Sequence, residues 1–276
     1  MIKQAIIPLA GMGTRMLPLT SVIPKELLPI NGKPGLEYIL DECIDAGIKD
    51  IFLVISKKKM MIKDYFYNDK FYTNLIKKKK NLRIKSEYKK ILKYKKFIKF
   101  VYQNKPLGTG DAILKTKKYI KDKFFLMLLP DDLIINQNCS KSMIKVHNRN
   151  KASVMASMTV KKSTVSRWGI YKLNKKLNQR DYTINDVIEK PLVKNAPSNK
   201  AVIGRYILPN SIFLKLLKQK AGIGGEIHIT DAIQSLIKEK EKFIAHSFSG
   251  KYLDCGTMDG YIKSALEISK LWSYAW

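Results

Sequence analysis

Apolar runs alternate with segments of helical period along the chain, and this alternation constrains the fold more than any other feature. The runs are almost continuously apolar, as in residues 50–56, which is typical of strands buried on both faces. Between them lie segments with one apolar face, such as residues 35–47, which end at Gly47. Buried strands separated by helices indicate a Rossmann-like, doubly wound α/β fold, with a mostly parallel central sheet and helices on both faces. The first half gives expected strands at 4–10, 50–56, 96–103, 123–132 and 152–160, and expected helices at 35–47, 110–120 and 140–150.

The second half of the chain is more mixed, and no linker or internal repeat interrupts it. We therefore expect one domain over residues 1–276, with a lysine-rich surface insertion around 57–96 and a helical end from about 257. The expected strands are 169–176, 201–209 and a strand–turn–strand unit over 243–257, and the expected helices are 211–217 and 228–240.

Length and composition bound the class of protein. A chain of 276 residues with 45% hydrophobic residues can form a sizeable core. No apolar run approaches the roughly 18 residues that a membrane helix needs, and the N-terminus lacks the pattern of a signal peptide. Cys43, Cys139 and Cys255 are far apart and odd in number, which favours neither a disulfide framework nor a zinc site. A reduced, cytoplasmic protein with no membrane partner is expected.

The formal net charge of +29 raises the question of a nucleic-acid partner. The chain has 46 Lys but only 6 Arg, whereas base readout and phosphate forks favour arginine. Residues 57–96 hold 16 of the 52 basic residues, so most of the excess is spread over the rest of the chain. We expect no specific nucleic-acid partner, although polyanions should bind at low salt.

A glycine-containing loop follows the first expected strand directly. Gly11, Gly13 and Arg15 would lie at the carboxyl end of a parallel strand, where open α/β sheets bind ligands. The loop is not a P-loop, because no Gly-Lys-Ser/Thr follows, and Met16 takes the third glycine position of the dinucleotide fingerprint. Arg15 and Lys25 bring two cations to the loop, which suits a triphosphate, although such a turn can also be purely structural. Its prolines predict an extended path back to Lys25.

Polar residues end two further expected strands. Gln103 closes the third strand, and its amide suits the edge of a nucleobase, with Gly108 close behind it. Asp131 and Asp132 end the fourth strand, where a carboxylate can hold Mg²⁺ or cap the next segment.

Eight motifs, among them "AGMGTRMLPLTSVIPKELLPI" and "GGEIHITDAI", resemble those of the bacterial UTP–glucose-1-phosphate uridylyltransferases. They occur in the family's order and cover nearly the whole chain. The related thymidylyltransferases share the GxGTR opening, but the "IPKELLP" and "GGEI" segments are similar to the uridylyltransferase branch. The motifs are "AGMGTRMLPLTSVIPKELLPI", "YQNKPLGTGDAI", "LLPDD", "WGIY", "VIEKP", "APSNKAVIGRYIL", "GGEIHITDAI" and "DCGTMDGYIKSALE".

The resemblance implies a nucleotidyltransferase that moves a uridylyl group from UTP to glucose 1-phosphate. It implies direct in-line displacement assisted by Mg²⁺, and a dimer or tetramer of identical chains. The implied catalytic residues are Lys25, Arg15, Asp131 and Lys190; the nucleotide-binding residues are Ala10, Gly11, Gly13, Gln103 and Gly108; the sugar-phosphate-binding residues are Gly169, Glu189, Lys190 and Glu226; and the metal ligands are Asp131 and Asp254. Arg205 is a further candidate, and Trp168 would wall the sugar site.

Three positions depart from the family pattern. Asp111 stands where histidine is common, Asp132 where an apolar residue is common, and His228 where glutamine is common. None removes a group that would contact substrate. Two other interpretations stay open: an enzyme that uses dTTP or another sugar phosphate, and a lysine-rich polyanion-binding protein that keeps the fold without catalysis.

Overall fold

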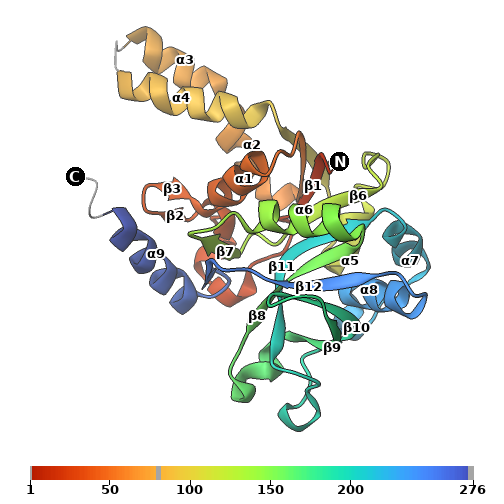
Figure 1. The fold of residues 1–276 in the computed structure, drawn as a ribbon. Coiled ribbons are helices and arrows are strands. Elements are labelled where there is room, and N and C mark those ends of the chain that lie inside the picture. Colours follow the sequence, from red (N-terminus) through yellow and green to blue (C-terminus); the bar gives the residue numbers. More distant parts are fainter. Residues whose placement is uncertain (1, 79–81, 273–276) are drawn as a thin grey trace.

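The computed structural model describes residues 2–78 and 82–272, and its central element is a nine-stranded sheet (Figure 1). The strand order across the sheet is β5-β4-β1-β6-β11-β8-β12-β10-β9. These strands are β1 Gln4–Pro8, β4 Asp50–Ile55, β5 Ile98–Tyr102, β6 Phe124–Leu128, β8 Ser153–Thr159, β9 Gly169–Lys176, β10 Asp181–Glu189, β11 Lys200–Pro209 and β12 Phe243–Ser247.

Most strands of the sheet run in one direction. β5, β4, β1 and β6 are parallel neighbours, and β8 pairs in parallel with β12. β11 runs antiparallel to β6, β8 and β9, and β10 runs antiparallel to β12 and β9. Only β10 and β11 therefore oppose the others, and the expected mostly parallel α/β sheet is confirmed.

The strands are buried on both faces because alternate side chains enter two separate hydrophobic layers. In β1, Ala5 and Ile7 pack into one layer, while Ile6 packs into the other. Helices α1 and α6 contribute to the first layer, and α5, α7 and α8 contribute to the second. The described helices are α1 Gly35–Asp45, α2 Met60–Tyr67, α3 Asp69–Lys78, α4 Leu82–Lys95, α5 Gly108–Leu114, α6 Cys139–Asn150, α7 Ile212–Lys218, α8 Ile229–Lys238 and α9 Met258–Trp272.

Two small ribbons complete the fold at the carboxyl end of the sheet. β2 (Pro29–Ile30) pairs with β3 (Lys33–Pro34), and β7 (Asp132–Ile135) pairs with β13 (Lys251–Asp254). In the second ribbon Asp254 lies opposite Asp132, which brings the segment before α9 close to the end of β6.

Three elements differ from the sequence expectation. The run 123–132 forms two strands, β6 and β7, because the chain turns through Pro130, which has no backbone N–H to offer a ladder. The helix expected over 110–120 starts at Gly108 and ends at Leu114. β10 was not expected, because its sequence "DYTINDVIE" alternates polar and apolar residues instead of forming a continuous apolar run.

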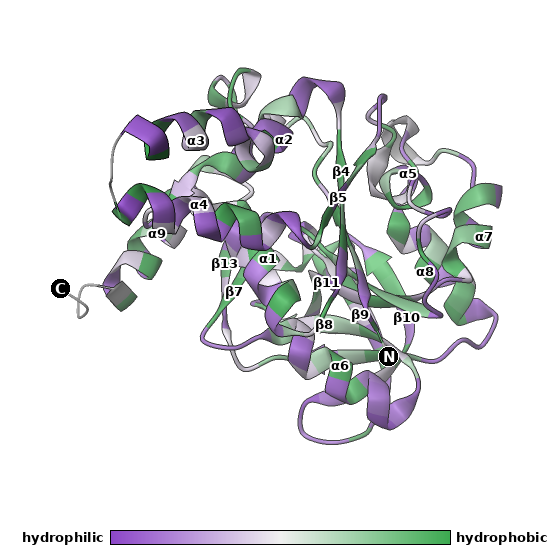
Figure 2. Cartoon of the chain, turned by 90° about the horizontal axis from the view of Figure 1, so that it is seen from above, coloured by the Kyte–Doolittle hydropathy of each residue, from purple (hydrophilic) through white to green (hydrophobic). Residues whose placement is uncertain are grey.

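The 57–96 segment forms α2, α3 and α4. Phe66 of α2 and Tyr94 of α4 are buried against the body of the protein, whereas α3 and the start of α4 project outward (Figure 1). Most residues of α3 and α4 are hydrophilic, in contrast to those of the central strand β4 (Figure 2). None of the helices in the described part of the chain has the length and apolar character to cross a membrane.

Candidate functional site

A first cavity of about 350 Å³ opens where β1, β5 and β6 end. Its walls come from the loop after β1, from the residue that follows β5 and from the Leu129–Asp131 turn after β6. This is the sheet edge at which open α/β folds bind ligands. Predicted site residues that line the cavity are Ala10, Gly11, Lys25, Gln103, Gly108, Asp131 and Glu226.

Gly13 turns the loop instead of lining the cavity. Its backbone has φ 69°, a left-handed conformation, and its carbonyl accepts hydrogen bonds from the Thr20 hydroxyl at 2.8 Å and from the Met16 amide at 2.9 Å. A Cβ at this position would lie 3.2 Å from the Thr20 methyl carbon. Glycine relieves both restraints, since it adopts positive φ without steric cost.

Gly11 leaves the cavity wall open, because a Cβ there would meet no heavy atom within 4 Å. The extended path expected from Gly13 to Lys25 is wrong. The chain winds through three short 3-10 turns, Thr14–Met16, Leu19–Ser21 and Lys25–Leu27. These turns bring Lys25 back to the end of β6.

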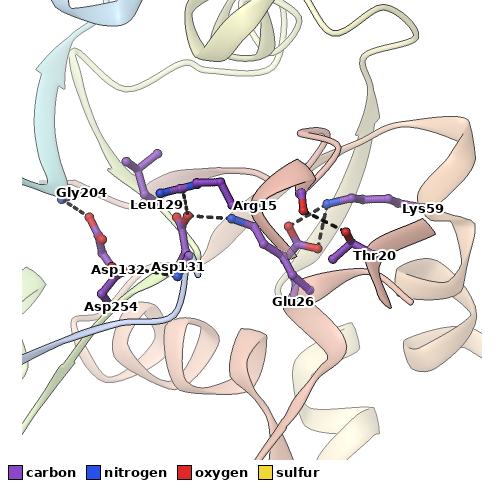
Figure 3. A network of polar contacts seen from close by, with 12 residues as sticks. Arg15, Thr20, Glu26, Lys59, Leu129, Asp131, Asp132, Gly204 and Asp254 are labelled. Atoms are coloured by element: carbon purple, nitrogen blue, oxygen red, sulfur yellow. Dashed lines mark hydrogen bonds and ion pairs between the residues drawn. The ribbon is translucent and has the colours of Figure 1, made fainter. Parts of the chain in front are cut away.

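Asp131 joins the two predicted cations of the loop (Figure 3). Its Oδ2 accepts a hydrogen bond from Lys25 Nζ at 2.6 Å and one from Arg15 Nη2 at 3.3 Å. Burial alone would raise the pKa of Asp131, but attraction to Lys25 outweighs it and lowers the pKa. Burial would likewise lower the pKa of Lys25, and Asp131 and Glu26 raise it instead. Both groups are therefore charged at neutral pH.

Behind Lys25, Glu26 forms a buried ion pair with Lys59 from the start of the 57–96 segment. Lys59 Nζ lies 2.8 Å from both carboxylate oxygens, and both side chains are below 10% exposed. Burial lowers the pKa of Lys59, and Glu26 partly offsets that shift. The pair therefore anchors Glu26, the residue after Lys25, to the start of the 57–96 segment.

Gln103 and Gly108 form the far wall of the first cavity. The Gln103 amide nitrogen donates to the Gly108 carbonyl at 3.0 Å and to Asp111 Oδ2 at 2.9 Å. Gly108 has φ 89°, and a Cβ there would lie 2.8 Å from the Ile227 carbonyl oxygen, so this close approach requires glycine. The Ile227 amide also donates to the Leu107 carbonyl at 2.8 Å, which brings the "GGEI" segment onto this wall.

That contact carries Glu226 into the first cavity rather than the second. Sequence reasoning grouped Glu226 with the sugar phosphate, but it lies beside Gly108, where a Cβ would be 2.9 Å from the Glu226 Cβ. The reason is long-range: the segment before α8 packs on the start of α5, and spacing along the sequence does not reveal this.

A second cavity of about 330 Å³ lies on the other side of Asp131. Leu129 and Asp131 line both cavities, so the two share one wall. Gly169 and Glu189 are cross-strand neighbours in β9 and β10, and a Cβ on Gly169 would approach Glu189 Oε2 to 3.1 Å. The lining includes Arg15, Arg167, Trp168, Gly169, Glu189, Tyr252 and Asp254.

Asp132 lies in the wall of the second cavity but is already satisfied by the protein. Its Oδ1 accepts from the Tyr252 hydroxyl at 2.7 Å and its Oδ2 from the Gly204 amide at 2.8 Å. Burial, together with the neighbouring Asp131, raises its pKa to about 6. Asp132, one of the three departures from the family pattern, therefore links the β7–β13 ribbon to β11.

Asp131 and Asp254 both lie beside Gly256. A Cβ built on Gly256 would lie 2.9 Å from Asp131 Oδ2, 3.1 Å from Asp254 Oδ1 and 2.9 Å from Arg15 Nη2, so the two carboxylates and the guanidinium border one small space. Residues 2–78 and 82–272 contain no group of three or more His, Cys, Asp or Glu side chains placed to hold a metal. Mg²⁺ commonly takes only one or two carboxylates together with substrate phosphates and water, and this pair fits that pattern.

Besides Gly13, two predicted residues lie outside both cavities. Lys190 is exposed, has φ 45°, and donates its backbone amide to the Trp168 carbonyl at 3.0 Å. Arg205 is fully buried and binds Glu42 of α1 through a hydrogen bond of 2.9 Å from Nη2 to Oε2. It also donates to the Leu129 carbonyl at 3.2 Å, so Arg205 supports the turn that presents Asp131.

Sequence reasoning missed several lining residues. Arg167 precedes Trp168 and adds a cation to the second cavity, and Tyr252 lines it from the β13 side. The two residues lie next to the motifs "WGIY" and "DCGTMDGYIKSALE", but only the spatial pairing of strands shows that they face one space. In the first cavity the missed residues include Met12, Thr14, Pro106 and Thr109.

His147 and His246 join structural elements and line neither of the two cavities. His246 Nδ1 lies 2.6 Å from Asp181 Oδ1, and its Nε2 lies 2.8 Å from the Ser142 hydroxyl. His147 Nδ1 lies 2.7 Å from the Ala152 carbonyl. These contacts tie α6 to neighbouring strands, in agreement with a structural role for both residues.

Known proteins resemble this chain in sequence and in fold over nearly its whole length. A family model described as nucleotidyl transferase matches residues 4–270. A UTP–glucose-1-phosphate uridylyltransferase from Staphylococcus saprophyticus is 39% identical over 96% of this chain and 91% of its own length. A crystal structure of UDP-glucose pyrophosphorylase complexed with UDP-glucose is 36% identical, with a TM-score of 0.85 over 98% of this chain and 99% of that one. A UTP-bound enzyme of the same kind from Acinetobacter baumannii is 33% identical, with a TM-score of 0.86 over 97% and 93%. The chain belongs to the nucleotidyl transferase family and, within it, to the UTP–glucose-1-phosphate uridylyltransferases.

Proposed function

We propose that this chain transfers the uridylyl group of UTP to glucose 1-phosphate, giving UDP-glucose and pyrophosphate. The observation that carries the proposal is the pair of cavities that share Asp131 as a wall, with the Lys25 ammonium 2.6 Å from its carboxylate. Two anionic substrates placed in these cavities would meet at this cation. Relatives at 36–39% identity carry the name of this activity.

Glucose 1-phosphate needs no general base, because its phosphate is already ionised at neutral pH. One of its phosphate oxygens forms a bond to the α-phosphorus of UTP, and the bond from that phosphorus to the pyrophosphate oxygen breaks. The electron pair leaves with pyrophosphate, and no covalent enzyme intermediate forms. Catalysis of this kind rests on positioning and on countercharge. Lys25 and Arg15 supply that charge beside the shared wall.

In this proposal the first cavity holds UTP. Ala10 and Gly11 lie against the nucleotide, Gly13 shapes the loop, and Gln103 with Gly108 reads uracil. The second cavity holds glucose 1-phosphate, with Gly169 against the sugar and Glu189 accepting hydrogen bonds from its hydroxyls. Lys190 meets the sugar phosphate only if its side chain swings in from the surface, and Arg167 is the cation already in the lining.

We also propose Mg²⁺ as the cofactor, with Asp131 and Asp254 as its protein ligands. When bound, the ion neutralises charge on the phosphates. Lys25 and Arg15 hold the Asp131 carboxylate in place at the shared wall.

Three wider expectations accompany this function. We propose that residues 1–276 act as one nucleotidyltransferase domain, with 57–96 as a surface insertion and a helical end from about 257. We propose that the protein works in the cytoplasm as a dimer or tetramer, which size-exclusion chromatography with light scattering would check.

A pyrophosphate-release assay with UTP, glucose 1-phosphate and Mg²⁺ tests the proposal. Release that requires both substrates is expected. Release with dTTP in preference to UTP would instead favour a thymidylyltransferase, so the four common triphosphates should be compared. No release with any of them would favour a polyanion-binding protein on the same fold.

A further inference from the structure

The amide of Gln103 has a defined orientation in the wall of the first cavity. The side chain is 4% exposed, and its Nε2 has two acceptors, the Gly108 carbonyl and Asp111 Oδ2. A primary amide carries two N–H donors, so these contacts occupy both. In the part of the chain that the structure describes, no partner is recorded for the amide oxygen. Gln103 can therefore offer a ligand only an acceptor.

Asp111 enforces this orientation more strongly than the carbonyl does. Asp111 is 4% exposed, and its carboxylate has only acceptor oxygens to offer the amide. If the amide turned over, its oxygen would face a carboxylate oxygen and a backbone carbonyl at hydrogen-bond distance. Two acceptors facing each other without a proton in a buried place are costly.

We infer that Asp111 is a specificity-determining residue that makes Gln103 a fixed acceptor and so selects bases with an N–H at ring position 3. This inference rests on the proposed function, since it places a pyrimidine nucleotide in the first cavity. Uracil and thymine carry that N–H, whereas the same position in cytosine is an unprotonated acceptor. A site built to accept a hydrogen bond rejects a ligand that lacks the donor far more strongly than it rejects a ligand of slightly different size.

The inference makes a selective claim. Asp111 should separate UTP from CTP but should not separate UTP from dTTP, because both present the same N–H. It is a positioning residue, since it acts on the base through Gln103. Its place in the first turn of α5, at the position where the family commonly has histidine, gives this chain its own means of holding the amide.

The test compares Asp111→Asn with the unaltered enzyme, using kcat/KM for UTP, dTTP and CTP with glucose 1-phosphate. Asparagine has the same shape but can donate as well as accept, so it tolerates the reversed amide. The UTP:CTP ratio of kcat/KM should fall about tenfold, the size expected for one charged hydrogen bond. The ratio should fall without inverting, because the Gly108 carbonyl still demands a donor. The UTP:dTTP ratio should stay unchanged.

Lys115→Met is the matched control, since it removes the other contact of the same carboxylate from a side chain that is 43% exposed. It should keep the ratios of the unaltered enzyme. Equal losses for UTP, dTTP and CTP in Asp111→Asn would mean a merely structural residue and would overturn the inference. So would a fall in the UTP:CTP ratio with Lys115→Met as large as that with Asp111→Asn.

Calorimetric binding of UTP and CTP separates this inference from the proposed function. If the unaltered protein releases no pyrophosphate, the proposed activity fails, yet the UTP:CTP ratio of dissociation constants still reports the base site. Asp111→Ala gives a second variant if Asp111→Asn does not fold. Equal dissociation constants of the unaltered protein for UTP and CTP would contradict the inference.

Discussion

The two cavities differ in how they present polarity. In the first cavity, Gly11, Gly108 and one buried amide, Gln103, line the wall opposite the charged Lys25 and Asp131. In the second, charged side chains dominate, among them Arg15, Arg167 and Glu189. A flat, rigid base can be recognised by a rigid backbone wall and one fixed acceptor. A sugar with several hydroxyl groups needs carboxylates and cations around it.

The wall that the two cavities share is built differently from the rest of either cavity. Asp131 is held by Lys25 and Arg15, and it is supported from behind by the buried Arg205–Glu42 pair. Variants at the wall should therefore impair both halves of the reaction, whereas variants within one cavity should affect one substrate. The following predictions test that division.

The largest effect is expected at Lys25. Lys25→Ala removes the cation at the shared wall and should lower kcat by about 10² or more, as expected for loss of a transition-state contact. Steady-state kinetics with both substrates would measure it. Lys33→Ala, which removes an ion pair with Asp41 outside the cavities, is the control and should leave kcat unchanged. Near-normal turnover of Lys25→Ala would remove this residue from the mechanism.

Asp131→Asn tests the metal proposal at the same wall. The variant keeps the shape of the side chain but loses its charge, so the Mg²⁺ concentration for half-maximal activity should rise about tenfold. A metal titration after chelation measures this value. Asp50→Asn, at a surface pair with Lys99, should titrate like the unaltered enzyme. An unchanged titration for Asp131→Asn would contradict its assignment as a ligand.

Glu189→Gln tests whether the second cavity serves the sugar alone. Loss of charge-assisted hydrogen bonds should raise KM for glucose 1-phosphate about fivefold or more. KM for UTP should not change, because Glu189 does not line the first cavity. A parallel rise in both KM values would show that the two cavities do not serve separate substrates.

The smallest effect is expected far from both cavities, in the projecting helices. Lys90→Ala removes a surface ion pair with Glu87 in which both side chains are at least half exposed. Such pairs contribute little to stability, so kcat and both KM values should not change. The free energy of unfolding should stay within about 0.5 kcal/mol of the original value. A marked loss of activity would assign the insertion a role that the structure does not suggest.

Sequence reasoning was most successful where the information is local. The strands β1, β5 and β6 follow from apolar runs, and Gln103, directly after β5, and Asp131, in the turn after β6, lie in the first cavity. It was weaker where position depends on distant packing. Glu226 reaches the first cavity only because the segment before α8 packs on α5.

Burial was the other quantity that the motifs did not reveal. Arg205 lies in a motif shared with the family, yet its guanidinium is enclosed with Glu42 and contacts no cavity. Lys190 is adjacent to Glu189 in the sequence, but it lies just beyond the end of β10, where its backbone has φ 45° and its side chain is exposed. A sequence motif therefore identifies a neighbourhood, and the strand geometry decides which member faces the ligand.

The buried pair between Lys59 and Glu26 sets a limit on how this chain can vary in length. Outward from Asp69, α3 and the start of α4 contain no buried residue, so deletions and insertions there should be well tolerated. A deletion that reached back to Lys59 would leave Glu26 as an enclosed carboxylate without its partner, beside Lys25. Breaking such a pair costs about 3–5 kcal/mol. Related chains could therefore lengthen or shorten this hairpin freely, as long as a cation remains at its root.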